Sequence, residues 1–190
     1  MAGHRFNPEK ANKLVSNERY DRLPPQQIFD DFHVGAGDKT ADLGAGNGFF
    51  TLPLAERTGS DVYALDIEPM MLEMLKERAE SQGIDKIHYI ESDLDHIKLE
   101  DQSVDKVVIS FVLHEVPDLN RTLAEINRIL KPGGKLIAVE WEALDEEAGP
   151  PLHHRIPSEE LKDILTENGY VIEKVTFPNP SNYVVGATPQ

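Results

Sequence analysis

The chain has 190 residues, which is typical of one domain and long enough to bury a substantial core. Its 34 acidic residues against 19 basic ones give a formal net charge of −15, which disfavours nucleic-acid substrates because phosphate backbones are bound by basic patches. Cysteine is absent, which excludes disulfides and thiolate metal sites. No apolar run approaches the length of a membrane span and no signal-peptide core is present, so we expect a cytoplasmic protein without membrane association.

The N-terminal part of the chain is polar, and its structure is hard to predict. Pro8 to Leu14 suits a short helix with Asn7 as its N-cap, and residues 24–32 suit a second helix. We therefore divide the chain into an N-terminal helical segment at residues 1–37, which could form a lid, and one domain at residues 38–190.

The domain alternates between short apolar strands and amphipathic helices. Proline, glycine and capping residues mark the ends of the helices. Strands are predicted at residues 40–43, 62–66, 87–91, 104–110 and 135–141. Helices are predicted from Phe49 to about Arg57, from Pro69 to Gly83, from Leu119 to Leu130 after Asp118 as N-cap, and from an N-cap at Ser158 to Gly169.

The C-terminal residues form a different pattern. Residues 170–177 and 182–187 read as two strands, and the loop between them is so short that they must pair as an antiparallel hairpin. Right-handed crossovers between the earlier strands place helices on both faces of a largely parallel sheet. The sequence thus predicts a doubly wound α/β fold.

The most informative motif is a glycine-rich turn after the first predicted strand. Asp42 is followed by Gly44, Gly46 and Gly48, and a second strand ends in Asp66. Glycine allows a tight turn and a close approach of the backbone to a ligand, and a carboxylate after the second strand can accept the hydroxyls of a ribose. The pairing predicts a nucleoside-containing cofactor across the ends of these strands.

The spacing of the glycines distinguishes between cofactors. The dinucleotide fingerprint requires Gly or Ala where this chain has Phe49, and a phenylalanine there would hinder the packing of helix on strand. Asp42 also precedes the first glycine by two residues. The pattern Asp-x-Gly-x-Gly-x-Gly resembles motif I of the class I S-adenosylmethionine (SAM)-dependent methyltransferases.

The resemblance continues through four more motifs, in the family's order, over residues 38–142. It covers the acid at Asp66, the acidic turn at Ser92 to Leu94, the fourth strand with residues 113–116, and the helix and turn at residues 123–134. The subgroup it resembles is that of small ubiquinone/menaquinone-biosynthesis C-methyltransferases. The resemblance implies a seven-stranded sheet of order 3-2-1-4-5-7-6 with strand 7 antiparallel. It also implies SAM as cofactor, bound by Asp42, Gly44, Ala45, Gly46, Gly48, Asp66, Ile67, Asp93, Leu94 and Ser110.

Candidates for catalysis follow the fourth and fifth strands, at the sheet edge where open α/β sheets bind ligands. His114 is a candidate general base because its ordinary pKa lies near neutrality, although it could instead support the cofactor. Glu140 is a second candidate, as a buried acid near the acceptor. Trp141 could present an aromatic face to the substrate or pack beneath a loop.

Two other segments could cover the site. The loop at residues 142–157 offers Arg155 for an anionic group, whereas adjacent His153 and His154 make a poor metal site, and we expect no bound metal. In the N-terminal segment, Phe6 and residues 19–20 could close over the cofactor.

Three classes of function remain open. The first is a SAM-dependent methyltransferase acting on a small-molecule acceptor, for which a homodimer is also compatible with the sequence. The second is a SAM-binding protein without catalytic activity, because the glycine motif binds cofactor and performs no chemistry. The third is an NAD-dependent oxidoreductase, which Phe49 and the motifs between residues 93 and 134 disfavour.

Overall fold

The computed structural model describes residues 15–190, so the expectations for Phe6 and for a helix beginning at Pro8 lie outside the described residues. The strands are β1 (Thr40–Leu43), β2 (Val62–Asp66), β3 (Ile87–Glu91), β4 (Val104–Ser110), β5 (Leu130–Trp141), β6 (Tyr170–Asn179) and β7 (Asn182–Pro189). The helices are α1 (Asn17–Arg22), α2 (Pro25–Asp31), α3 (Thr51–Thr58), α4 (Pro69–Ser81), α5 (Leu119–Ile129) and α6 (Ser158–Glu167), and a 3-10 turn lies at Leu152–His154.

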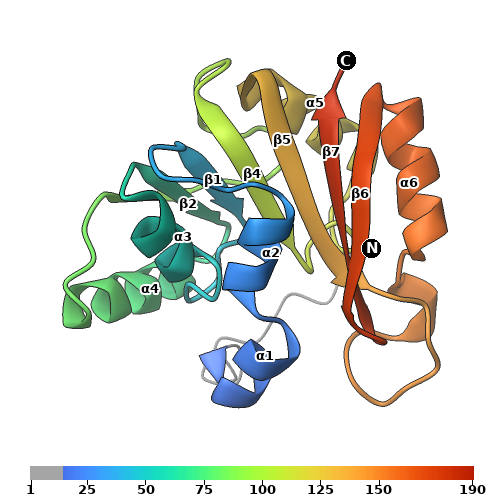
Figure 1. The fold of residues 1–190 in the computed structure, drawn as a ribbon, viewed down its shortest axis with the longest axis horizontal. Coiled ribbons are helices and arrows are strands. Elements are labelled where there is room, and N and C mark those ends of the chain that lie inside the picture. Colours follow the sequence, from blue (N-terminus) through green and yellow to red (C-terminus); the bar gives the residue numbers. More distant parts are fainter. Residues whose placement is uncertain (1–14) are drawn as a thin grey trace.

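All the strands belong to one seven-stranded sheet of order β3-β2-β1-β4-β5-β7-β6 (Figure 1). The strands from β1 to β5 pair in parallel, whereas β7 runs antiparallel to both β5 and β6. The predicted order is confirmed. The direction of winding reverses between β1 and β4, which is the switch point where sheets of this kind bind ligands.

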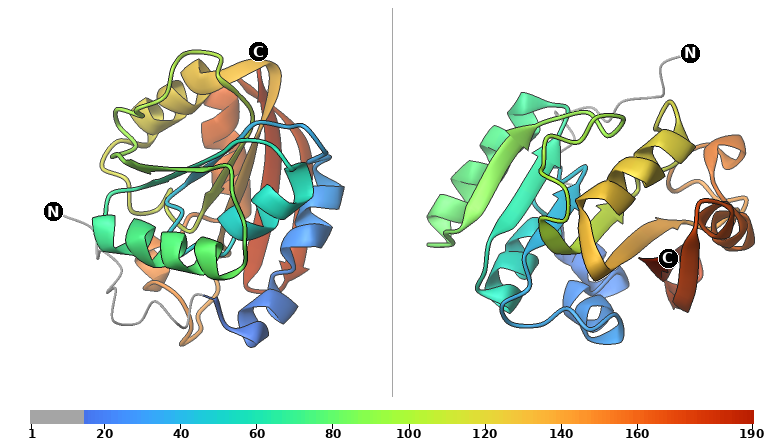
Figure 2. Two further views of the ribbon diagram at one scale, coloured as in Figure 1. Left: turned by 90° about the vertical axis from the view of Figure 1, so that its left-hand side faces the viewer. Right: turned by 90° about the horizontal axis from the view of Figure 1, so that it is seen from above.

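The helices form a layer on each face of the sheet (Figure 2). On one face, buried side chains of α5 and α6 pack with inward residues such as Leu43, Val107 and Tyr183. On the other face, α2 and α3 pack with Val108 and Val139, and α4 lies against β2 and β3. The doubly wound architecture is therefore confirmed.

Local signals in the sequence set several element ends. The carboxylate of Asp118 accepts the N–H of Arg121 at 3.0 Å, so the predicted N-cap of α5 is confirmed. Gly59 adopts a left-handed conformation with a φ of 57° immediately after α3. Leu123, Ile126 and Ile129 are fully buried, which explains the apolar spacing along α5.

Other predicted ends were wrong because of contacts distant in sequence. The N-cap of α6 is Pro157, and Ser158 is the first helical residue, where its N–H donates to Oε1 of Glu142 at 3.3 Å. β5 begins at Leu130, before the predicted start, because that residue pairs with Val104 ahead of an irregularity in the ladder. Within residues 15–190, none of the helices is long and apolar enough to cross a membrane.

Candidate active site

The predicted site residues share one edge of the sheet because the strands that carry them are parallel and in register. Leu43 of β1 pairs with Leu65 of β2 and Ile109 of β4. The chain therefore leaves the sheet at this edge in the glycine turn, at Asp66 and at Ser110. Ser110 pairs with Val139 of β5, which adds Glu140 to the same edge.

The glycine turn approaches the end of β2 closely. The N–H groups of Gly44 and Ala45 both donate to the carbonyl of Leu65, at 2.8 and 2.9 Å. Gly44 has a φ of +71° and Gly46 a φ of +53°. A Cβ on Gly44 would also lie 2.3 Å from Cγ2 of Val112. The positive φ therefore favours glycine at both Gly44 and Gly46, and at Gly44 the close approach of Val112 also leaves no room for a side chain.

Asp66 connects the second strand to this turn. Its Oδ2 accepts the N–H of Gly46 at 2.8 Å, and its Oδ1 accepts the N–H of Glu68 at 2.9 Å. Burial raises the pKa of Asp66, and these two backbone hydrogen bonds partly counteract the rise. Each carboxylate oxygen has two lone pairs, so the fixed side chain can still accept hydrogen bonds from a vicinal diol.

Asp42 is a buried acid beneath the turn. It is 1% exposed, and its Oδ2 accepts the Thr51 hydroxyl at 2.6 Å. Its Oδ1 has no hydrogen-bond partner in the described part of the chain. Burial raises the pKa of Asp42 to about 7, and the negative charge of Asp66 adds to the rise. A positively charged ligand above the turn would favour the ionised form of this acid.

The residues predicted to bind adenine follow β2 and β3, which are neighbouring strands. Ile67 is 45% exposed despite its apolar side chain, and Leu94 is half-buried. Asp93 is exposed, and its Oδ1 accepts the N–H of His96 at 2.8 Å. An exposed apolar surface with a carboxylate of fixed orientation suits a planar base that carries an amino group.

The two catalytic candidates form a pair. Nδ1 of His114 lies 2.8 Å from Oε2 of Glu140, whose side chain is fully buried. Glu140 also accepts the backbone N–H of Trp141 at 3.2 Å. Because Nδ1–H donates to the carboxylate, Nε2 is the ring nitrogen left for proton transfer. Sequence reasoning treated the two residues as alternatives and missed their pairing.

The environment of His114 favours its protonated form. Burial lowers the pKa of His114, but the hydrogen bond and charge of Glu140 and the charge of Glu115 raise it, and the net direction is upward. The histidine side chain is only 4% exposed, and its Nε2 lies 3.7 Å from Oε1 of Glu115. The imidazole can thus hold a proton that it has taken from another group.

Phe111 lies between Ser110 and His114, in the segment expected to bound the acceptor pocket, and has a backbone conformation that the sequence did not reveal. It follows Ser110 with a φ of 59°, a conformation that is rare for a bulky residue and often marks a functional site. Its N–H donates to the carbonyl of Val139 at 2.8 Å, and its ring lies 5.3 Å from that of Trp141. The two rings form an aromatic wall beyond β4 and β5. The positive φ depends on tertiary structure and has no signal in the sequence.

Helix α1 packs against Phe49, the residue that follows the glycine turn. The rings of Tyr20 and Phe49 stack with centroids 4.5 Å apart. The guanidinium of Arg19 lies 4.5 Å from the centroid of Phe49 and 5.1 Å from that of Phe111. Burial lowers the pKa of Arg19 to about 10. Helix α1 thereby connects the turn to the aromatic wall.

The proposal that Arg155 meets an anionic substrate was wrong, because the guanidinium is occupied by its own loop. It is 1% exposed and donates to Oε1 of Glu146 at 2.9 Å and to the carbonyls of Pro150, Glu142 and Ala148. It also lies 5.3 Å from the centroid of the Trp141 ring. Trp141 therefore packs beneath the loop while its ring also contacts Phe111.

Together these features define an α/β protein whose residues at the switch point of the sheet suit a nucleoside-containing cofactor. The glycine turn, the orphaned oxygen of Asp42 and the carboxylate of Asp66 suit a cofactor with a cationic centre and a ribose. Residues 41–138 match the methyltransferase domain family. The chain belongs to this family of class I SAM-dependent methyltransferases, as the sequence motifs predicted.

Individual relatives agree with this assignment. A demethylmenaquinone methyltransferase of Staphylococcus haemolyticus is 34% identical over 134 residues, which are 70% of this chain but only 55% of the relative's length. A SAM-dependent methyltransferase of Aquifex aeolicus superposes with a TM-score of 0.91 at 26% identity, over 96% of this chain and 98% of that one. The [4+2]-cyclase SpnF shares the fold with a TM-score of 0.78 at 18% identity, over 90% of this chain and 81% of that one, so the fold alone does not fix the reaction.

Proposed function

We propose that this chain transfers the methyl group of SAM to a ring carbon of a small planar acceptor of the hydroquinone type. The observation that carries the proposal is the His114–Glu140 pair, which stands at the same sheet edge as the glycine turn. The similarity to a demethylmenaquinone methyltransferase supports the acceptor class. The chain spans little more than half of that relative, so activity and acceptor are proposed here for this chain itself.

Methylation of a ring carbon requires a proton to leave the acceptor. Bound SAM supplies an electrophilic methyl group on a sulfonium. Nε2 of His114 takes the proton, either from a hydroxyl before attack or from the ring carbon after the new carbon–carbon bond has formed. Glu140 holds Nδ1–H at 2.8 Å and stabilises the imidazolium that results. The products are the methylated ring, S-adenosylhomocysteine and one proton.

We place the cofactor against the residues at the glycine turn. Asp66 would accept hydrogen bonds from the ribose hydroxyls, and the ionised form of Asp42 would favour the cationic end of the cofactor. Ile67 and Leu94 would enclose the adenine, with Asp93 accepting a hydrogen bond from its amino group. Ala45 and Gly48 are buried within the turn and Ser110 is half-buried at the end of β4, so these residues would support the cofactor's site from beneath.

We place the acceptor against the aromatic wall of Phe111 and Trp141. Phe111 and Trp141 offer apolar faces to a planar ring and exclude water from the reacting atoms. Helix α1 would act as a lid, because Tyr20 and Arg19 rest on Phe49 and Phe111 without belonging to the sheet. The net charge of −15 supports a small molecule over a nucleic acid as the acceptor.

Radiolabelled methyl transfer tests this function. The assay mixes purified protein with SAM that is tritiated in its methyl group. The acceptor is a short-chain 1,4-naphthohydroquinone with one unsubstituted carbon in its quinol ring, and we expect the label to become bound to that carbon. A catechol serves as an oxygen acceptor for comparison. Transfer to catechol oxygen alone would contradict carbon methylation. SAM binding without transfer to these acceptors or to a metabolite extract would favour the non-catalytic SAM-binding protein.

A further inference from the structure

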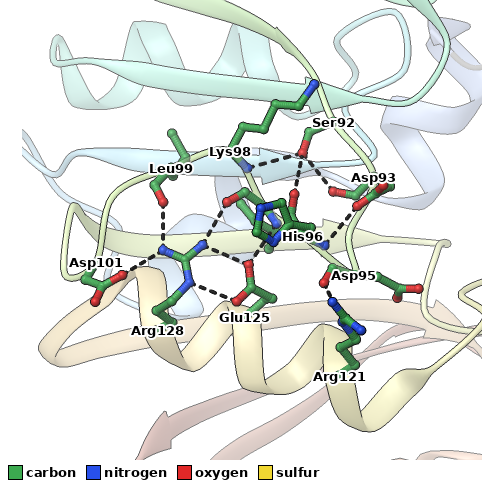
Figure 3. Close-up of polar contacts among 11 residues, drawn as sticks. Ser92, Asp93, Asp95, His96, Lys98, Leu99, Asp101, Arg121, Glu125 and Arg128 are labelled. Atoms are coloured by element: carbon green, nitrogen blue, oxygen red, sulfur yellow. Dashed lines mark hydrogen bonds and ion pairs between the residues drawn. The ribbon is translucent and has the colours of Figure 1, made fainter.

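The connection between β3 and β4 lacks helices and strands, yet side chains of α5 hold it at several points (Figure 3). It comprises residues 92–103 and begins with Ser92 and Asp93. Unstructured connections of this length are uncommon in compact domains and are often functional. The contacts that hold this connection in place therefore also influence the position of Asp93.

Arg128 is the main anchor of the connection. Its guanidinium donates to the carbonyls of Ile97 and Leu99, each at 2.7 Å, and to Oδ1 of Asp101 at 2.8 Å. These bonds use the planar fork of donors that distinguishes arginine from lysine. One side chain thus fixes three points of the connection.

Glu125, one turn earlier on α5, completes the anchor. It receives two hydrogen bonds from Arg128, both at 2.8 Å. Its Oε2 also accepts the backbone N–H of Ile97 at 2.8 Å. Both backbone polar groups of Ile97 are therefore bound by this pair. The hydrogen bond from Arg128 holds the pKa of Glu125 below its ordinary value, so the carboxylate stays charged.

The anchored segment continues directly into the turn that orients Asp93. The N–H of Lys98 donates to Oγ of Ser92 at 3.2 Å, and that hydroxyl lies 2.8 Å from the carbonyl of Asp93. The N–H of His96 donates to Oδ1 of Asp93 at 2.8 Å. His96 and Lys98 flank Ile97, so the position of Ile97 sets the two N–H groups that hold the turn (Figure 3).

We propose that Arg128 and Glu125 are positioning residues for recognition of the adenine ring, acting through Ile97 on the carboxylate of Asp93. The inference rests on the proposed function, in which Asp93 accepts a hydrogen bond from the adenine amino group. A purely structural anchor would lower the stability of the fold without changing how the protein distinguishes adenine from a base that lacks this amino group.

The test measures discrimination by calorimetry, as the ratio of dissociation constants for SAM and for its analogue whose purine lacks the exocyclic amine. Wild type is expected to prefer SAM by about tenfold, the effect of one charge-assisted hydrogen bond. Arg128→Met and Glu125→Gln are expected to reduce this ratio to about threefold or less. Arg128→Lys keeps the charge but loses the fork, and is expected to behave like Arg128→Met.

Arg57→Met is a matched control, because Arg57 also bonds a loop carbonyl, that of Val34, and a carboxylate, that of Asp30. It should lower the melting temperature and leave the ratio at its wild-type value. An Arg128 variant that loses stability but keeps the wild-type ratio would overturn the inference. If Arg128→Met does not fold, Glu125→Gln gives the same decision.

Asp93→Asn separates failure of the inference from failure of the proposed function. If Asp93→Asn keeps the wild-type ratio, Asp93 does not recognise the adenine, and the assignment beneath the inference is wrong. If Asp93→Asn abolishes the preference while the Arg128 variants retain it, only the inference is wrong. The proposal expects the double variant Arg128→Met/Asp93→Asn to show no loss beyond that of Asp93→Asn, because both changes act on one hydrogen bond.

Discussion

His114 and Glu140 are 26 residues apart in the chain, yet Nδ1 of the histidine lies 2.8 Å from Oε2 of the glutamate. They meet because β4 and β5 are adjacent and parallel. His114 follows the carboxyl end of β4, and Glu140 lies at the carboxyl end of β5. The buried carboxylate fixes the imidazole tautomer and favours its protonated form. Because the pKa of His114 is raised, this histidine loses its proton at a higher pH than an ordinary histidine does.

The pair predicts a pH profile. Because His114 must be neutral to accept a proton and its pKa is raised, turnover should rise with pH through a midpoint above the ordinary histidine value. Glu140→Gln keeps an acceptor for Nδ1–H but removes the charge that raises the pKa, so the midpoint should move to lower pH. Steady-state rates measured across the acidic, neutral and mildly alkaline range check this. An unmoved midpoint would show that another group titrates.

The same pair predicts how stability depends on pH. A raised pKa in the folded state means that the ion pair stabilises the protein below the ordinary histidine pKa, and that this stability is lost as pH rises through the raised value. Glu140→Gln should therefore lower the melting temperature more at a pH below the ordinary histidine pKa than at a pH well above the raised one. Equal losses at the two pH values would contradict an ion pair between His114 and Glu140.

Replacing His114 separates chemistry from cofactor binding. His114→Ala should lower turnover by about 10²–10⁴-fold, the usual contribution of a general base, while SAM affinity stays near the wild-type value. Turnover and calorimetric affinity are measured on the same preparation. A loss of affinity in proportion to the loss of activity would instead make His114 a support for the cofactor. Full activity would remove it from the site.

We expect the replacement of Asp42 to have opposite effects on the stability of the free protein and on the binding of SAM. The pKa of Asp42 is raised to about 7, so the free protein loses stability as pH rises from the ordinary aspartate pKa to about 7, where only the unfolded state is fully ionised, and this loss is complete above that value. Asp42→Asn should raise the melting temperature of the free protein above that pH, by about 2–4 °C per kcal/mol gained. It should weaken SAM more than S-adenosylhomocysteine, which lacks the positive sulfonium. Equal weakening of both ligands would show that Asp42 does not sense this charge.

The strands that build the site could be predicted because local patterns determine them. The predicted bounds of β1 to β4 match those of the structure, and Asp118 caps α5 through a bond to a residue three positions away. The glycine turn could also be predicted, because the positive φ at Gly44 and Gly46 favours glycine at these positions. These features depend on contacts between near neighbours in the chain.

What the sequence did not reveal depends on distant contacts. Arg155 looked available to a substrate, but carbonyls of its own loop and Glu146 surround it. Ser158 was predicted to cap α6, but it is the first helical residue and its N–H donates to Glu142. Helix α1 was not predicted, because none of its own side chains is fully buried and its covering contacts lie on Phe49 and Phe111. Residue type alone cannot show which partner reaches a side chain.

Calorimetric titration of SAM into wild type, Asp66→Asn and Asp61→Asn tests the central claim most directly. The Asp66→Asn side chain would keep one acceptor oxygen but lose the charge that strengthens bonds to the ribose hydroxyls, each of which contributes about 1.5–3 kcal/mol. Asp61 precedes the other end of β2, bonded to His88, and serves as the control. Wild type and Asp61→Asn should bind SAM alike and not bind NAD, and Asp66→Asn should bind SAM at least about tenfold more weakly. Equal affinity in all three proteins, or binding of NAD in place of SAM, would contradict the account.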